Sequence, residues 1–432
     1  MKDVYRLRLM AEYLASVRNE VAIEVAFLKA IGKHRDHCGH MPRSPRWLTC
    51  PKRVLQLTRA AAPVIRLVWI TLGFWIILGL EWMNTVRRVG AAGTRPPAPR
   101  PVLHDRCLFG VSDRAFHIAG SMAFSGMPMA RLYCPWIEHA AEAQTDPSAI
   151  RLFDLLDRRD LWSCVLLASA AHLNLARDQT LRIWVLQGYT AFRWFMTRIA
   201  LTRVSTHWIT TEHYDRWAVL LDGVVKQERR SSHRADSLEK HGFTLIQHGS
   251  MNSLSSSGST PVFPELPYRL SCISELHVYS EATAEGFKRH VLSKRGAAEL
   301  KAVHLFKPTI ALSPVEPVDA TKVLFIGHSA CEDFHLQVLA ELEAEQGLLC
   351  LYKPHPKSPM SRKAAAARWR IINDPLCYPR CELAIAYPST LAIEYQEAGV
   401  KVIQHGMDEP LTQAAAIARR AAAALAYRGA RT

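Results

Sequence analysis

Residues 322–406 restrict the fold more than any other part of the chain, because short apolar runs alternate there with stretches of helical periodicity. Strands are predicted at 323–326, 348–352, 370–372, 383–387 and 401–404, and helices at 332–346, from Ser389 onward and at 411–427. Alternating strands and helices of these lengths build a parallel sheet with helices on both faces. This part of the chain is therefore expected to form a doubly wound α/β domain.

The region 102–312 predicts a second α/β domain. Helical periodicity occurs at 151–175 and 180–200, and strand-like runs follow at 206–211, 243–247 and 276–280. These strands end in polar residues, and open α/β sheets bind ligands beyond the carboxyl ends of their strands. A Ser-rich segment at 250–261 is interpreted as a mobile loop of the site. A Pro-rich connection at 308–317 separates the two domains.

Residues 1–100 are expected to form a basic helical extension that ends in a Pro- and Gly-rich linker at 90–101. The first 30 residues mix charged side chains into the apolar pattern, so no signal peptide is predicted. The uncharged run 67–80 is shorter than the roughly 20 apolar residues that a spanning helix needs, and the wider segment 64–83 includes the charged residues Arg66 and Glu81. Its tryptophans and flanking arginines suit a helix lying in a membrane interface. A buried core helix is the alternative.

The charge balance limits the class of partner. The 54 Lys and Arg against 39 Asp and Glu give a net charge of +15, which favours anionic partners such as phosphates or an anionic membrane surface. No nucleic-acid partner is predicted, because the basic residues are spread along the chain rather than interleaved with aromatic residues. The ten cysteines form no CxxC pair, which favours reduced thiols and a cytoplasmic location.

The motif LYKPHPK directly follows a predicted strand. Pro354 and Pro356 fix the backbone on both sides of His355 and exclude a helix. Lys353 and His355 are therefore expected at the carboxyl edge of the sheet, where charge-assisted hydrogen bonds can hold a phosphate. A plain surface turn is the alternative interpretation.

The motif YPSTLAIEYQE places Ser389 and Thr390 at the start of a helix. The unpaired amides and the positive dipole end of a helix N-terminus attract anions. Glu394 lies one turn beyond Thr390 on the same face, a suitable position for binding ribose hydroxyls. Ordinary helix capping is the alternative.

The motif TLIQHGS ends a predicted strand at Gln247, His248 and Gly249. The glycine permits a sharp turn that exposes His248, and an imidazole is the natural general base near neutral pH. Glu212 and His213 follow another predicted strand, and either could orient His248, bind an acceptor or act as the base itself. A structural histidine is the alternative.

Gly327 and His328 open the segment GHSACED after a predicted strand. The segment has neither a GxGxxG fingerprint nor a P-loop. We interpret it as the loop that opens the donor-binding domain, with His328 near the phosphate.

Together, QHG after one strand, KPHP after a later strand and PST-x-x-x-E before GVKVIQHG resemble bacterial capsule-polysaccharide and CDP-glycerol glycerophosphotransferase-type enzymes. The His-Pro and Ser/Thr pairs are also similar to motifs of bacterial sialyl- and polysialyltransferases. The resemblance covers about residues 205–406. It implies the GT-B arrangement of two Rossmann-type domains, 101–312 on the acceptor side and 313–432 on the donor side, facing each other across a cleft.

The same resemblance implies site roles. It assigns His248 as the base and gives the donor phosphate contacts from His355, Ser389 and Thr390. Glycerophosphotransferases usually have Trp before the first His-Gly and Asp after the serine pair. This chain has Gln247 and Glu394 at those positions, which favours a sugar donor.

The resulting hypothesis is a metal-independent, inverting glycosyltransferase at the cytoplasmic face of the inner membrane. It would move a sugar from a nucleotide-sugar donor to a polysaccharide or lipid-linked acceptor. The nucleotide-activated donor is the substrate, so no cofactor is expected, and without a DxD motif no metal site is expected either. The segment HRDHCGH at 34–40 lacks standard zinc spacing and is interpreted as a basic loop. A glycerophosphotransferase, an epimerase on the same fold and a non-catalytic membrane scaffold remain alternatives.

Overall fold

The computed structural model describes most of the chain, and its elements fall into two compact units. The described residues are 2–30, 63–93, 105–111, 129–136, 148–231, 242–249, 263–317, 320–342, 347–356 and 360–429, with the single positions 61, 116, 118, 119, 146, 251 and 358. Unit 1 holds the described residues of 2–25, 61–248 and 263–306, and unit 2 holds those of 26–30, 249–251 and 307–429. The segments 34–40 and 252–261 and most of the linker at 90–101 lie outside the described residues.

Unit 1 contains a seven-stranded parallel sheet with the order β3-β2-β1-β4-β5-β6-β7. Its strands are β1 (Arg106–Phe109), β2 (Ala130–Tyr133), β3 (Ala149–Arg151), β4 (His207–Thr210), β5 (Phe243–Ile246), β6 (Ile273–Val278) and β7 (Ala302–Leu305). The strands predicted at 206–211, 243–247 and 276–280 correspond to β4, β5 and β6. The sequence pattern did not predict the other four.

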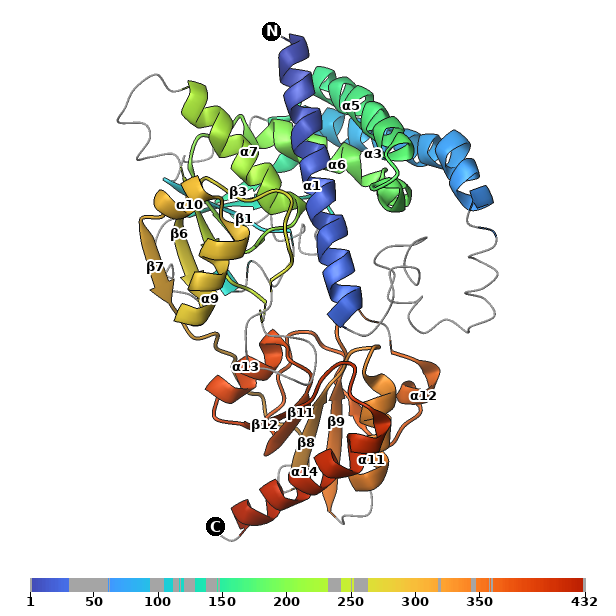
Figure 1. The fold of residues 1–432 in the computed structure, drawn as a ribbon, viewed down its shortest axis with the longest axis vertical. Coiled ribbons are helices and arrows are strands. Elements are labelled where there is room, and N and C mark those ends of the chain that lie inside the picture. The colour runs from blue at the N-terminus through green and yellow to red at the C-terminus, as the bar shows by residue number, and fades with distance from the viewer. Residues whose placement is uncertain are drawn as a thin grey trace. The chain divides into compact units, whose positions relative to one another are not determined.

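Unit 1 also contains helices, among which α3, α5 and α6 form one group (Figure 1). They are α1 (Lys2–Ala30), the π turn η3 (Trp69–Gly73), α3 (Phe74–Gly93), η5 (Leu152–Leu155), α5 (Arg158–Arg177), η6 (Arg182–Gln187), α6 (Thr190–Leu201), α7 (Arg216–Ser231), α9 (Glu281–Gly286), η7 (Phe287–Val291) and α10 (Lys294–Ala298). The helix predicted at 151–175 begins later, because the side chains of Asp157 and Asp160 form a capping box.

Helix α1 is built into unit 1 through buried polar contacts. The amide of Asn19 donates to the carbonyls of Tyr214 at 3.0 Å and Tyr268 at 2.9 Å. Glu12 accepts from Arg198 Nε at 2.8 Å, and the guanidinium side chain is fully buried. Because such contacts are costly to leave unmade in the interior, they hold α1 to the rest of unit 1, to which its residues 2–25 belong.

Unit 2 contains a five-stranded parallel sheet with the order β10-β9-β8-β11-β12. Its elements are β8 (Thr321–Ile326), α11 (Glu332–Leu342), β9 (Leu348–Lys353), α12 (Arg362–Ala365), β10 (Arg370–Ile371), β11 (Leu383–Ala386), α13 (Thr390–Glu397), β12 (Lys401–Gln404), η8 (Leu411–Gln413) and α14 (Ala414–Gly429). Each of the five strands predicted from the sequence is present. The helix predicted at 411–427 starts as a 3₁₀ turn.

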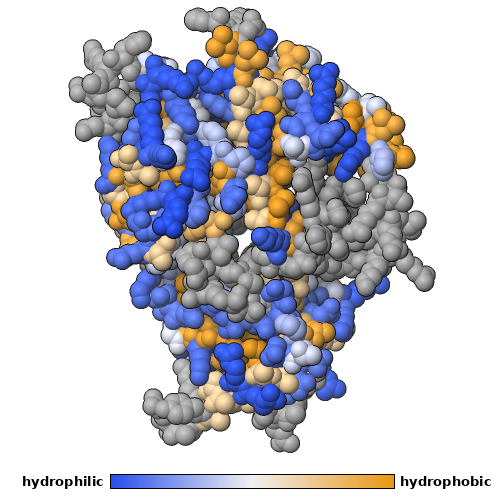
Figure 2. Space-filling view, viewed as in Figure 1, coloured by the Kyte–Doolittle hydropathy of each residue, from blue (hydrophilic) through white to orange (hydrophobic). Residues whose placement is uncertain are grey.

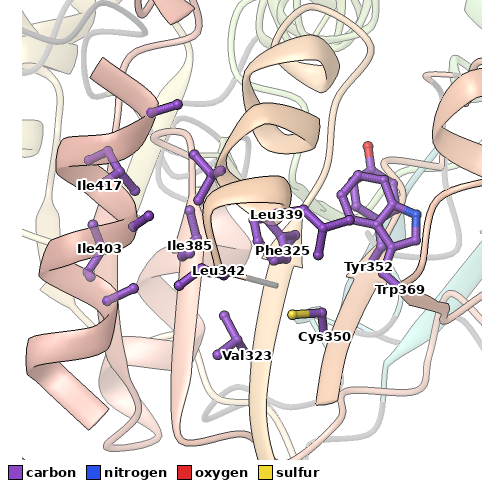
Figure 3. Packing of buried hydrophobic residues seen from close by; sticks show 14 of the residues in the cluster. Val323, Phe325, Leu339, Leu342, Cys350, Tyr352, Trp369, Ile385, Ile403 and Ile417 are labelled. Carbon is purple, nitrogen blue, oxygen red and sulfur yellow. The ribbon is translucent and has the colours of Figure 1, made fainter. Parts of the chain in front are cut away.

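Successive residues of the buried strands serve opposite faces of this sheet. Val323 and Phe325 pack in a cluster with α11 and α14 (Figure 3). Leu324 and Ile326 pack in another cluster with Tyr395 of α13 and with Leu28. Apolar residues on both faces explain why these strands appear as continuous apolar runs in the sequence.

The two sheets share one topology. Numbered along the chain within its unit, each sheet contains the strand order 3-2-1-4-5. In such sheets, ligands bind where the strand order reverses, beyond the carboxyl ends of the first and fourth strands. That point lies after β1 and β4 in unit 1 and after β8 and β11 in unit 2. The prediction of an α/β protein with two parallel, Rossmann-like sheets is confirmed.

The helix Pro63–Val89 is the one helix of the described residues that is long and apolar enough to cross a membrane. Its 27 residues exceed the length expected from the sequence, and only 11% of its most apolar 18-residue stretch is buried. Figure 2 shows hydrophobic side chains at the surface in this region, at the upper right. The interpretation as a buried core helix is therefore not supported.

Candidate functional site

The carboxyl ends of β4 and β5 bring several of the predicted site residues of unit 1 together. Gln247 is buried, and its backbone N–H donates to the carbonyl of His277 at 2.8 Å. Its side-chain oxygen accepts from the N–H of Tyr279 at 2.8 Å. Gln247 thus holds the end of β5 to the end of β6, which fixes the start of the loop that carries His248.

His248 and His213 form a packed pair, with ring centroids 4.4 Å apart. The N–H of His248 donates to Nε2 of His213 at 2.8 Å, so the neutral His213 ring carries its proton on Nδ1. Burial holds the pKa of His213 well below its usual range, and the nearby His248 lowers it further. His213 is therefore a neutral hydrogen-bond acceptor that positions the backbone of its partner.

The half-buried ring of His248 is oriented by Thr211. Its Nδ1 lies in close hydrogen-bond contact with the Thr211 carbonyl. Because a carbonyl only accepts, the neutral ring carries its proton on Nδ1 and its lone pair on Nε2. A neutral imidazole oriented in this way through Nδ1 has the form that a general base requires.

Glu212 lies at the same strand end and is buried. Its N–H donates to Thr210 Oγ1 at 3.1 Å. Burial raises the pKa of the Cys134 thiol, and the charge of Glu212 raises it further. Glu212 is thus placed at the switch point of unit 1. Gly249, which directly follows His248, belongs to unit 2.

In unit 2, the loop after β8 carries Gly327 and His328. A Cβ on Gly327 would lie 2.1 Å from the Tyr352 ring, so glycine is required for close packing on β9. Nδ1 of His328 accepts from the N–H of Ala330 at 3.1 Å. The neutral ring therefore carries its proton on Nε2.

His355 lies beside His328, with ring centroids 5.3 Å apart and an edge-to-face geometry. Two hydrogen bonds tie their loops together. Ser329 N–H donates to Ser358 Oγ at 2.8 Å, and Ser358 Oγ donates to Ser329 Oγ at 2.6 Å. Tyr387, the residue after β11, packs on His328 with ring centroids 5.6 Å apart. The ends of β8, β9 and β11 thus place two imidazoles at the switch point.

Ser389 caps helix α13, as the sequence predicted. Its Oγ accepts from the N–H of Ala392 at 3.2 Å. Thr390 is the first helical residue and is partly exposed. Glu394 is 4% exposed, so a ribose would reach its carboxylate only if neighbouring side chains moved. The amides of the first turn of α13 remain the main anion-binding feature at this position.

Lys353 has a role that the sequence pattern did not reveal. Its buried ammonium donates to the carbonyls of Asp374 and Cys377, both at 2.8 Å, and lies 5.2 Å from the centre of the Tyr378 ring. Two of its three donors therefore hold the loop between β10 and β11. This geometry favours a structural role for Lys353 over a direct contact with a donor phosphate.

Both sheets carry the tetrapeptide Ile-Gln-His-Gly at the end of their fifth strand, after β5 and after β12. The second histidine, His405, is buried, donates from Nδ1 to the adjacent Gly406 carbonyl at 2.8 Å, and lies 2.7 Å from Nε2 of His335. His248 instead is half-buried and is oriented by a residue 37 positions earlier. Sequence reasoning missed this duplication and the parts played by Thr211, Ser358 and Tyr387, although the repeated tetrapeptide was a visible signal.

Comparison with known proteins adds no family assignment. The chain matches no protein-family model, and no curated protein matches it. The geometry therefore supplies the argument for function. Unit 1 presents an oriented imidazole at a strand end, and unit 2 presents two imidazoles and a capped helix N-terminus at its switch point.

Proposed function

We propose that the chain is a glycosyltransferase that moves a sugar from a nucleotide-activated donor to a polysaccharide or lipid-linked acceptor. The single observation that carries the proposal is the orientation of His248 by the Thr211 carbonyl and the buried His213. In that arrangement the neutral ring carries its lone pair on Nε2, at the end of β5. Deprotonation of an acceptor hydroxyl by this nitrogen would prepare the hydroxyl for in-line attack on the anomeric carbon.

The donor phosphate is assigned to unit 2. His328 and His355 would contact the phosphate through their imidazoles, and the first turn of α13 supplies backbone amides and the positive end of a helix dipole. These groups would stabilise the negative charge that develops on the departing nucleotide. We propose that the two units together form the GT-B arrangement that the sequence motifs resemble. The nucleotide-activated donor is the substrate, and this assignment routes no step through a metal.

Nucleotide binding tests the donor assignment. A panel of CMP-, CDP-, UDP- and GDP-compounds is screened by thermal shift, because a ligand that binds the native state raises its melting temperature. We expect one nucleotide class to stabilise the protein and His355→Ala to abolish the shift. Ser389→Ala should do the same, whereas Ser361→Ala is a matched control, since Ser361 caps α12 with the same 3.2 Å contact.

Turnover tests the base assignment. His248→Ala should retain the nucleotide-induced shift and lose transfer to acceptor. Full activity in His248→Ala would overturn the role of that residue. A protein that no nucleotide stabilises would instead favour the non-catalytic scaffold.

The same proposal places the protein at an anionic membrane surface. The helix Pro63–Val89 exposes apolar side chains, and α5, which packs against α3, adds an exposed stripe at Trp162, Leu166 and Leu173. Glu81 is the one acidic residue of the apolar helix, and it is paired with Arg193. A continuous apolar surface beside arginines is typical of interfacial helices.

Vesicle co-sedimentation tests this surface. We expect binding to anionic vesicles and little binding to neutral ones. Ile76→Glu, at a position 51% exposed, should weaken binding at least about tenfold. Leu376→Glu, at a position 55% exposed in unit 2, should leave binding unchanged. Equal binding by both variants would exclude the apolar helix as the contact.

A further inference from the structure

Three side chains of metal-binding type converge in unit 1, and the proposed transfer does not use them. Glu275 and His277 lie on β6, and His304 lies on the neighbouring strand β7. One ligand atom from each lies within 4.8 Å of the others. A tetrahedral metal with bonds of about 2.1 Å separates its ligand atoms by about 3.4 Å, so small side-chain rotations would bring this set to coordination distance.

The sheet register creates this cluster. Glu275 and His277 are two residues apart and therefore share one face of β6. His277 pairs with His304 in the β6–β7 register, and their rings stack with centroids 4.5 Å apart and an angle of 26°. A shift of one residue in either strand would point one imidazole to the other face. The convergence is thus specified by the fold.

Outer hydrogen bonds orient the carboxylate. Thr244 Oγ1 donates to Glu275 Oε2 at 3.1 Å, and Nε2 of His207 lies 2.8 Å from the same hydroxyl. Because the hydroxyl donates its proton to the carboxylate, it accepts from His207. Metal ligands are commonly held in place by such outer partners.

The charge of the cluster also suits a metal. Glu275 supplies the negative charge that a divalent cation requires.

We propose that Glu275, His277 and His304 bind a divalent first-row transition metal, with zinc as the preferred ion. Two imidazole nitrogens and one carboxylate oxygen match zinc, whereas magnesium and calcium prefer oxygen ligands alone. Three protein ligands leave a fourth position for water. The metal would clamp the edge strand β7 to β6. It would also support the end of β5, because the N–H of Gln247 donates to the His277 carbonyl.

Metal titration of the untagged full chain tests the site. After chelator treatment, Zn²⁺ is titrated by calorimetry, and Co²⁺ is followed by its visible absorption. We expect one ion per chain and a higher melting temperature. His304→Ala and Glu275→Gln should each weaken binding at least about tenfold, and Thr244→Ala should weaken it by about tenfold through the outer hydrogen bond. His304 is exposed, so its removal should preserve the fold by circular dichroism.

Two control variants separate this site from other metal-binding residues. Cys331, His335 and His405 form a second, buried group of potential ligands in unit 2, and His37 belongs to the His-rich segment outside the described residues. Cys331→Ser and His37→Ala should leave binding unchanged. The assignment is overturned if no ion binds stoichiometrically, if His304→Ala and Glu275→Gln bind normally, or if either control variant removes the ion.

Discussion

Nε2 of His213 accepts a hydrogen bond from the backbone N–H of His248 at 2.8 Å. His213 thus holds the main chain of His248, while the Thr211 carbonyl holds the ring of His248. This division of roles separates a residue that positions the base from the base itself, and the two can be tested independently.

Replacing His213 by Ala should lower the rate of transfer at least about tenfold while nucleotide affinity stays unchanged, because the loop that carries His248 loses its anchor. His213→Gln should recover much of the rate, since its amide oxygen can accept the same hydrogen bond. Steady-state kinetics with saturating donor distinguishes the variants. A merely structural role would lower both variants equally and would change the KM for donor as well.

Acid should destabilise the fold through its buried neutral histidines. Burial lowers the pKa of His172 to about 4, and the ring of His172 stacks on Phe74 of the apolar helix with centroids 3.7 Å apart. The unfolded chain, with a histidine pKa of about 6.5, binds more protons between pH 6.5 and 4. Stability is therefore complete above about pH 6.5 and decreases as the pH falls toward 4.

The melting temperature should accordingly be roughly 5 °C or more lower at pH 4.5 than at pH 7. His172→Phe should show a smaller decrease, because one of the groups that takes up a proton on unfolding is gone. Thermal melts of both proteins across this range measure the difference. Identical pH profiles would show that His172 contributes nothing to the effect.

Removing the carboxylate of Glu12 should destabilise unit 1 by about 3–5 kcal/mol, because it leaves a buried guanidinium without its charged partner. The side chain of Glu12 is 13% exposed, and that of its partner Arg198 is fully buried. Glu285→Ala serves as the control, since this carboxylate is 66% exposed in its pair with Lys288. The control should change the free energy of unfolding by less than about 1 kcal/mol. Urea denaturation measures both, and equal effects would refute the assignment.

Lys353→Met should lower stability by about 1–3 kcal/mol and leave nucleotide affinity within about threefold, because its ammonium binds the carbonyls of Asp374 and Cys377. Chemical denaturation and nucleotide titration of the same variant measure the two quantities. Loss of nucleotide binding at unchanged stability would instead restore the phosphate role that the KPHP motif suggested.

The central strands of unit 2, β8, β9 and β11, could be predicted because each is a largely buried apolar run bounded by polar or Pro residues. The first strands of unit 1 could not be predicted in this way. β1, β2 and β3 contain three or four residues and include arginines, so they carry too little periodicity to be distinguished from loops. They are held in the sheet by pairing in the order β3-β2-β1, and β1 pairs with β4 across a long sequence separation.

The residue types of the candidate site were visible in the sequence, but their partners were not. Ser389 was predictable as a cap because its partner lies three residues away. Lys353 was misleading because its acceptors lie 21 and 24 residues further along the chain. The same holds for Thr211, whose carbonyl orients a ring 37 residues later. Contacts of this range are set by the topology of the sheet and not by local spacing.

The duplicated Ile-Gln-His-Gly tetrapeptide allows two copies of one motif to be compared within the same chain. The same four residues end equivalent strands, yet His405 is buried in a neutral pair with His335. His248 instead is half-buried and is oriented by the distant Thr211 carbonyl. Reactivity at such a motif is therefore a property of what surrounds it. Grafting the tetrapeptide onto another strand end would transfer its shape without transferring its chemistry.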